Sequence, residues 1–239
     1  MIFNKFFILF KIGRKIGKSN IINIVSETHK IPVFIKLFFN LLAFSFSSSN
    51  NTKSKAKENL SESIQEMGTT FIKLGQFLAT RPDIIGEKLS KELESLQDKL
   101  PPFSKKEAEK IIIENLGQSN FDDIIDLSEP IAAASIAQVH KAKIKEDNII
   151  KNVAIKVLRP NIKKIFNDEI DAIMLLAYIV ESLISKTKRL KLIEVVFLFK
   201  EITNHEMDLR FEAAAANEYA ENTKNDLGFF VPKIYWNFT

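Results

Sequence analysis

The segment DLSEPIAAASIAQVHKAKIKEDNIIKNVAIKVLRP, residues 126–160, decides the fold class. A polar turn divides it into two runs that are rich in residues typical of strands. In the second run Val153, Ile155 and Val157 alternate with residues that include Lys156. Because successive side chains of a strand point to opposite faces, one face is apolar and the other carries the lysine. The segment therefore predicts two antiparallel strands with one buried face.

Helical periodicity is found on both sides of this strand pair. Ser104 and Glu107 form an S-x-x-E capping box, and Gly117 is placed to end the helix that Ser104 begins. The other predicted helices span about 58–80, 84–100, 162–186 and 192–223, and a last strand is predicted at 231–236. This order of elements predicts an α+β fold with a small antiparallel sheet.

The composition is that of a globular protein and excludes several kinds of site. The 239 residues are 46% hydrophobic and 27% charged, and they include no cysteine, so disulfides, thiolate metal sites and cysteine nucleophiles are excluded. His29, His140 and His205 are too scattered to suggest a zinc site. The net charge of +4 is modest, and the folded part shows no basic stripe interleaved with aromatic residues. Nucleic acid is therefore not an expected partner.

The first 46 residues form a basic, aromatic, amphipathic segment. Residues 1–26 contain lysine and arginine but no acidic residue, which suits an anionic membrane surface. The second apolar run, 31–46, is shorter than the roughly 20 apolar residues that a spanning helix needs. We expect residues 1–46 to lie on a membrane, with ordinary core helices as the alternative. Residues 47–57, rich in serine, asparagine and lysine, are the expected linker.

The helix predicted over 58–80 has an apolar stripe and a polar face. Thr69, Lys73, Gln76 and Thr80 gather on the polar face. A lysine in such a position is usually solvated. The alternative is that Lys73 reaches a specific partner.

Two further groups of residues suggest a nucleotide cleft. Ala154 and Lys156 share one face of the predicted strand, where a small alanine admits an adenine ring and the ammonium group reaches phosphates. On the helix predicted over 192–223, Asp208 and Glu212 are four residues apart and share a face, whereas Glu206 lies about 160° around from Asp208. The alternatives are an edge-strand lysine in water and a solvated acidic helix face.

Five motifs occur together in a fixed order. They are KxGQ at Lys73–Gln76, PPF at Pro101–Phe103, PIAAAS at Pro130–Ser135, VAIKVLRP containing Lys156, and ExD at Glu206–Asp208 followed by Glu212. With these motifs the chain resembles the UbiB family of atypical kinase-like proteins over roughly residues 58–239. Bacterial members of that family support ubiquinone biosynthesis.

The resemblance implies a domain organisation and a set of site residues. Residues 58–124 would be a helical KxGQ extension, and residues 125–239 a protein-kinase-like N-lobe. ATP or ADP with Mg would be bound by the N-lobe, where Lys156 would pair with Glu212. The implied nucleotide-binding residues are Ala132, Ala133, Ala134, Ser135, Ala154, Lys156 and Glu212. Lys73, Gln76, Glu206 and Asp208 would form a lid, with Lys73 paired to Glu206.

The alanine-rich loop also bears on the reaction that the resemblance implies. Ordinary kinases place glycines over the phosphates, because glycine lets backbone amides approach closely. Here alanines replace them, so the grip on phosphate must differ. The resemblance therefore favours an ATPase or an atypical small-molecule kinase over a protein kinase.

The family's catalytic-loop and Mg-binding residues follow the VPKIYW segment, in a C-lobe that we expect to be absent from this chain. Asp226-Leu227-Gly228 is interpreted as a turn. No complete catalytic set and no metal ligand are therefore expected, and Mg would be held by the missing C-lobe. Three interpretations stay open: a truncated or split product completed by a C-lobe polypeptide, an inactive remnant, and a non-catalytic membrane-surface module. The expected location is cytoplasmic and peripheral at the inner membrane of a bacterium, among ubiquinone-pathway proteins.

Overall fold

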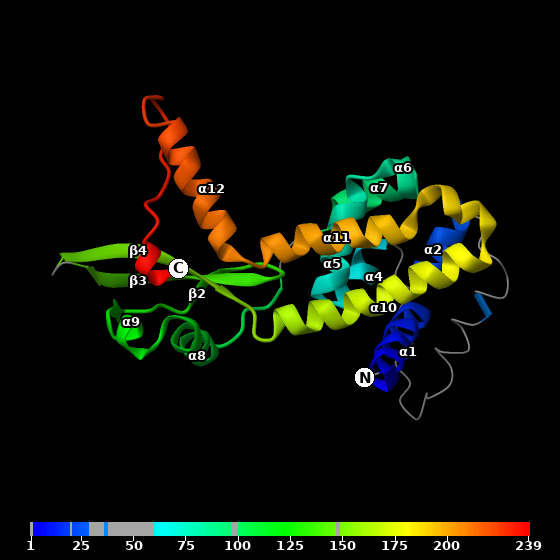
Figure 1. Ribbon diagram of the computed structural model, residues 1–239, viewed down its shortest axis with the longest axis horizontal. Coiled ribbons are helices and arrows are strands. Elements are labelled where there is room, and N and C mark those ends of the chain that lie inside the picture. The colour runs from blue at the N-terminus through cyan, green and yellow to red at the C-terminus, as the bar shows by residue number, and fades with distance from the viewer. Residues whose placement is uncertain (1, 20, 29–35, 38–59, 97–99, 147–148) are drawn as a thin grey trace. The chain divides into compact units, whose positions relative to one another are not determined.

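The computed structural model describes residues 2–19, 21–28, 36–37, 60–96, 100–146 and 149–239 (Figure 1). It forms two compact units, each built from segments that are distant in sequence. The first unit comprises Met1–Asp98 and Lys164–Lys200, and the second Lys99–Lys163 and Glu201–Thr239. The predicted linker, 47–57, lies outside the described residues.

The second unit contains a four-stranded antiparallel sheet with β3 at its centre. Its strands are β1 (Ile124–Ile125), β2 (Pro130–Ala133), β3 (Ala137–Glu146) and β4 (Ile149–Leu158). β4 pairs with β3 along its whole length, from Ala137↔Leu158 to Glu146↔Ile149. β1 and β2 pair with other parts of β3. The predicted strand pair and the α+β fold class are confirmed.

Two helices of the second unit cover the apolar face of this sheet. In α8 (Lys105–Leu116) the predicted cap is confirmed, because the Ser104 side chain accepts a hydrogen bond from the Glu107 amide at 3.3 Å. Gly117 ends the helix with φ of 81° and begins α9 (Gln118–Asp122). Ala108 of α8 packs in one buried cluster with Ala142 of β3 and Val157 of β4. The other side of β4, which carries Lys156, is left for a functional role.

The helix predicted over 192–223 is two helices in the structure. α11 (Leu192–Glu206) ends before Met207, and α12 (Leu209–Asn222) begins after Asp208. Asp208 has φ of −109° and ψ of 96°, and its carboxylate accepts a hydrogen bond from the Arg210 amide. Asp208 is thus the N-cap of a new helix, which an uninterrupted periodicity did not reveal.

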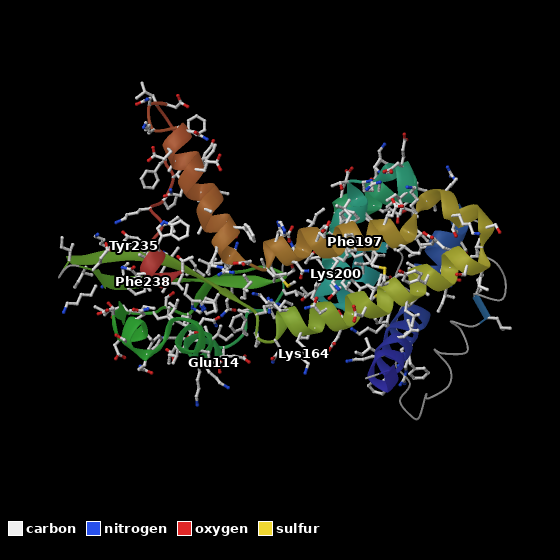
Figure 2. The ribbon with its side chains drawn as sticks, viewed as in Figure 1. Glu114, Lys164, Phe197, Lys200, Tyr235 and Phe238 are labelled. Carbon is white, nitrogen blue, oxygen red and sulfur yellow. The ribbon has the colours of Figure 1, made fainter. Side chains whose placement is uncertain are left out.

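The predicted strand at 231–236 is wrong. Residues 229–235 are irregular, and a 3-10 turn, η2 (Trp236–Phe238), follows. Pro232 lacks the amide that a strand ladder needs, and side-chain contacts hold the segment instead. Lys233 lies 3.6 Å from Glu146, and the Lys151 ammonium is 5.6 Å from the Tyr235 ring centroid (Figure 2). The Asp226–Gly228 turn, by contrast, is confirmed.

Among the described residues of the first unit, all regular elements are helices. Its helices are α1 (Ile2–Lys18), α2 (Ile21–Thr28), α4 (Leu60–Met67), α5 (Thr69–Ala79), α6 (Pro82–Ile85), α7 (Glu87–Glu94), most of α10 (Ile162–Leu183), η1 (Ser185–Leu190) and the first part of α11. The helices predicted over 58–80 and 84–100 are therefore each wrong as single helices. Gly68 and Gly86 break them with φ of 104° and 84°, a region that glycine enters without steric cost.

One buried cluster of the first unit joins three helices that all lie in the first 96 residues. Ile24 of α2 and Leu60 of α4 pack in one buried cluster with Leu93 of α7. The Lys15 ammonium of α1 donates a 2.7 Å hydrogen bond to the Met67 carbonyl at the end of α4. Among the described helices, none combines the length and the apolar character that crossing a membrane requires.

Candidate functional site

Three strands of the second unit place one residue each in a row on the exposed face of the sheet. The register pairs Ala132 of β2 with Val139 of β3, and Val139 with Lys156 of β4. Ala154, which lies two residues before Lys156 on β4, pairs with Lys141 of β3. Directly opposed residues of antiparallel strands point to the same face. The sheet therefore brings Ala132, Ala154 and Lys156 together, as expected, and adds Val139, which strand alternation alone could have revealed.

Lys156 forms an ion pair with Glu212 across the second unit. The ammonium lies 2.7 Å from Oε1 and 2.5 Å from Oε2 of the carboxylate. The side chains retain 38% and 59% of their exposure, so water and solutes reach both groups. Glu212 stands in the first turn of α12, where a carboxylate is favoured by the helix dipole. The Lys156–Glu212 contact expected from the family resemblance is thus present.

The alanine-rich segment is only partly a loop. Ala132 and Ala133 belong to strand β2, and the turn is confined to the residues that follow. The turn is closed by a 2.8 Å hydrogen bond from the Ala134 amide to the Ala137 carbonyl, and Ser135 within it is fully buried. Ala133 pairs with Gln138 and so faces the core side of the sheet, away from Lys156. The prediction of one continuous loop over Ala132–Ser135 is therefore wrong.

Arg159 anchors this turn and was missed as a site residue. Its Nε and Nη2 donate to the Ala134 carbonyl at 3.0 and 2.8 Å, and its Nη1 donates to the Pro101 carbonyl at 3.0 Å. One guanidinium group thus ties the PPF motif to the alanine-rich turn. The signal available in the sequence was an arginine directly after an otherwise apolar strand end.

A buried polar chain lies on the core side of β3. Gln138 brackets the Phe103 backbone, accepting from its amide at 2.9 Å and donating to its carbonyl at 3.1 Å. The Gln138 Nε2 group also lies 2.9 Å from His140 Nε2, and His140 Nδ1 lies 2.8 Å from the Ser128 carbonyl. Since the amide donates and the carbonyl accepts, these contacts fit the His140 tautomer that carries its proton on Nδ1. Polar residues at inward strand positions were the overlooked signal.

This site lies inside a segment that matches a known family. The ABC1 atypical kinase-like domain matches residues 95–239, well over half of the chain. The chain belongs to the ABC1 atypical kinase-like family. The resemblance deduced from the five motifs is therefore confirmed.

Curated relatives of this ABC1 chain are bacterial proteins described as probable protein kinase UbiB. The protein of Pseudomonas paraeruginosa is 32% identical over 232 residues, which is 96% of this chain and 43% of the relative. The proteins of Marinobacter nauticus and Cellvibrio japonicus are 33% and 34% identical, over 88% and 87% of this chain and 38% of each relative. The chain thus spans about two fifths of the length of these relatives. No solved structure matches.

The KxGQ motif of this ABC1 chain lies on α5 of the first unit. Lys73 and Gln76 are half-buried, and Gly75 is buried. A Cβ added at Gly75 would stand 2.4 Å from a methyl group of Leu96 and 3.4 Å from Ile64. A larger residue at this position would therefore force the Leu96 side chain to move. Because Lys73 belongs to the first unit and Glu206 to the second, their pairing stays a prediction.

The ExD motif is arranged differently from the expectation. Asp208 and Glu212 do not share a helix face, because Asp208 lies outside α12 as its cap. Asp208 instead forms a two-point ion pair with Arg210, with Nε–Oδ1 and Nη2–Oδ2 distances of 2.8 and 2.5 Å. These hydrogen bonds lower the pKa of Asp208 to about 2. Among the described residues no group of histidine and acidic side chains is arranged to hold a metal ion.

We expect Arg210→Met to raise the pKa of Asp208 toward the ordinary value of about 3.9. Because the folded pKa is lowered, the ionised pair stabilises the fold above pH 4, and this contribution is lost as the pH falls through about 2. NMR titration of the Asp208 carboxyl carbon measures the shift directly. An unchanged titration in Arg210→Met would show that Arg210 does not set this pKa.

Proposed function

We propose that this ABC1-family chain binds ATP or ADP on the exposed face of its sheet and acts within a UbiB-type atypical kinase or ATPase that supports ubiquinone biosynthesis. The observation that carries the proposal is the Lys156–Glu212 ion pair beside Ala154. A lysine held by a helix glutamate is the device with which kinase-like proteins fix a phosphate-binding ammonium. Because the chain belongs to an atypical kinase-like family, phosphate binding is the favoured role for the Lys156–Glu212 pair.

The exposed residues fit a nucleotide better than they fit its metal. Ala132 and Ala154 are exposed and small, so a flat ring can approach the sheet, and Lys156 supplies a cation for phosphates. When bound, ATP would supply the phosphoryl group. The Mg that such chemistry needs finds no ligand set among the described residues. We propose that a C-lobe, in a longer chain or a second polypeptide, provides the metal ligands.

The arrangement of the turn supports a small-molecule reaction or ATP hydrolysis. Ala134 and Ser135 occupy a turn in which the Ala134 carbonyl accepts hydrogen bonds from Arg159. The backbone of this turn therefore has less conformational freedom than that of a glycine-rich loop. A rigid turn with methyl groups limits how closely amides approach phosphate. We propose an ATPase or atypical small-molecule kinase for this reason.

The proposal predicts that Lys156→Ala weakens nucleotide binding about 10- to 100-fold. A charge-assisted hydrogen bond contributes roughly 1.5–3 kcal/mol, which corresponds to that change in Kd. The measurement is titration of the purified chain with a fluorescent ADP analogue in the presence of Mg. Glu212→Gln is expected to weaken binding less, because the lysine remains but loses its orienting partner.

Lys151→Ala is the matched control for this experiment. Lys151 stands on the same strand and is also paired with a glutamate, Glu146, at 2.6 Å. It lies five residues away, or about 16 Å along an extended strand. Its loss should leave the affinity within twofold. Equal weakening by both substitutions, or no saturable binding by folded protein, would refute the proposed site.

A second candidate function is a module that binds an anionic membrane surface, and α1 supports it. The spacing places Phe7, Phe10, Lys11 and Lys18 on one face of α1. Phe7 and Phe10 are 67% and 38% exposed, and both lysines are exposed. Buried Ile12 faces the other way. Aromatic side chains flanked by cations suit a lipid interface, at the inner membrane of a bacterium in this proposal.

The membrane candidate predicts co-sedimentation with phosphatidylglycerol vesicles that declines as salt rises and is indifferent to nucleotide. Lys11→Glu combined with Lys18→Glu should reduce the bound fraction at least fivefold, since each cation contributes about 1 kcal/mol near an anionic surface. Lys88→Glu combined with Lys91→Glu, at exposed positions of α7, is the matched control. Equal losses in both double variants would assign binding to overall charge and not to α1.

A further inference from the structure

The first unit contains a concavity that the proposed nucleotide site does not use. Its volume is about 490 Å³, and it is lined by residues at α6, at the end of η1 and in the first turns of α11. Small-molecule sites in proteins usually have volumes of about 300–1,000 Å³. The concavity is therefore large enough for a small ligand.

The charged groups around this concavity leave one cation unmatched. Arg81 pairs with Asp83 at 2.9 and 2.8 Å, and Lys191 lies 3.0 Å from both carboxylate oxygens of Glu194. Arg189 lines the same space and forms no ion pair with any carboxylate that the structure describes. The guanidinium group of Arg189 thus remains available, and the concavity carries a net positive charge.

Four apolar residues complete the lining, and polar groups contribute the larger share of its exposed surface. The apolar residues are Ile84, Leu190, Val195 and Leu198. Leu198 keeps 40% of its exposure, so an apolar surface faces solvent next to the arginine. A ligand with an apolar body would cover this surface, whereas a bare inorganic ion would leave it wet.

The backbone at the rim is held in an unusual conformation. Lys191 has φ of 50° and ψ of 52°, in the left-handed region that residues other than glycine rarely adopt. Its carbonyl accepts from the Val195 amide at 3.0 Å, so this residue joins η1 to α11, and both of these elements line the concavity. Backbone strain of this kind concentrates at ligand sites and other functional regions.

We propose that this concavity binds an amphipathic oxyanion, a carboxylate or phosphate attached to an apolar body. Arg189 receives the head group, because its planar guanidinium group matches the geometry of carboxylate and phosphate oxygens. Leu198 and its apolar neighbours receive the body. The inference rests on the first unit alone and does not depend on the nucleotide site.

Titration of the full chain with four probes tests the proposal. The probes are octyl phosphate, octanoate, octanol and inorganic phosphate, all below micelle-forming concentrations, and the readout is amide chemical shifts in NMR spectra. Saturable binding of octyl phosphate or octanoate, at least 10-fold tighter than that of octanol and inorganic phosphate, is expected. Preference between the two anionic probes assigns the head group. Competition by phosphatidylglycerol vesicles would identify a lipid source, and lack of competition a soluble one.

Two exposed arginine and lysine positions provide a matched pair of variants. Arg189→Gln should weaken binding about 10- to 100-fold, the loss expected for one charge-assisted contact. Lys188→Gln removes the same charge from the adjacent residue, which does not line the concavity, and should change affinity less than twofold. Leu198→Ala should weaken the binding of octyl phosphate but not the binding of inorganic phosphate. Equal effects of the two charge variants, or octanol binding as tightly as octyl phosphate, would overturn the proposal.

Discussion

Gln138→Met is expected to destabilise the second unit by about 2–4 kcal/mol. The side chain is 1% exposed, and methionine retains its length while it removes both polar atoms. The Phe103 amide and carbonyl and the His140 Nε2 atom would all lose their partner. Each buried polar group left without a hydrogen bond costs roughly 1–3 kcal/mol, and partial access of water to Phe103 keeps the sum at the lower end.

Urea unfolding followed by tryptophan fluorescence measures this loss. The chain has a single tryptophan, Trp236, which lies in the second unit and reports on its unfolding. Gln118→Met is the matched control, because this glutamine is exposed and pairs only locally with Asp122 at 2.8 Å. The control should stay within about 0.5 kcal/mol of the parent. Indistinguishable urea midpoints for the two variants would mean that the hydrogen bonds of Gln138 add nothing to stability.

The loss of stability in Gln138→Met matters for the proposed function because the hydrogen bonds of Gln138 also support the candidate site. Gln138 holds the PPF segment from one side, and Arg159 holds it from the other through the Pro101 carbonyl. Arg159 also holds the Ala134 carbonyl in the turn next to the exposed face. The row formed by Ala132, Val139 and Lys156 thus lies on a sheet that the Gln138 and Arg159 side chains tie to the neighbouring segments.

The sequence predicted the parts of this site that depend on local patterns. Alternation in β4 placed Lys156 opposite the apolar residues, and the capping box located the start of α8. The family resemblance added the Lys156–Glu212 pair, whose members are far apart in the sequence. These features are set by neighbouring residues or by motifs that the family shares, so the sequence alone was enough to predict them.

The errors occurred where single residues override a periodic pattern. Gly68 breaks the helix that carries KxGQ, and Asp208 begins a new helix inside the ExD motif. Periodicity averages over several turns and therefore does not register one residue with a different backbone conformation. The strand predicted before Trp236 was wrong for another reason. A strand forms only where a neighbouring strand offers an edge to pair with, and no local sequence pattern specifies that edge. Gln138 was overlooked because a polar inward residue makes sense only once its partner, Phe103, is known.

In the first unit the largest effect is expected from Phe199→Ala, at about 3–5 kcal/mol. Phe199 is 1% exposed and packs against Phe77 and Phe166, with ring centroids 5.6 Å away in each case. The three rings come from α5, α11 and α10, so their contact joins helices that are distant in sequence. Removal of the central ring leaves a cavity that cannot collapse without moving all three helices.

Phe197→Ala is the control that separates burial from the loss of an aromatic ring. It lies two residues earlier on α11 (Figure 2). It is 55% exposed, so its removal should change the free energy of unfolding by less than about 0.5 kcal/mol. Urea unfolding followed by far-ultraviolet circular dichroism compares the two variants, because most described residues of the first unit lie in helices. Since both substitutions remove the same atoms from the same helix, only packing against Phe77 and Phe166 distinguishes them. Equal losses would therefore contradict the proposal that contact among these three rings stabilises the first unit.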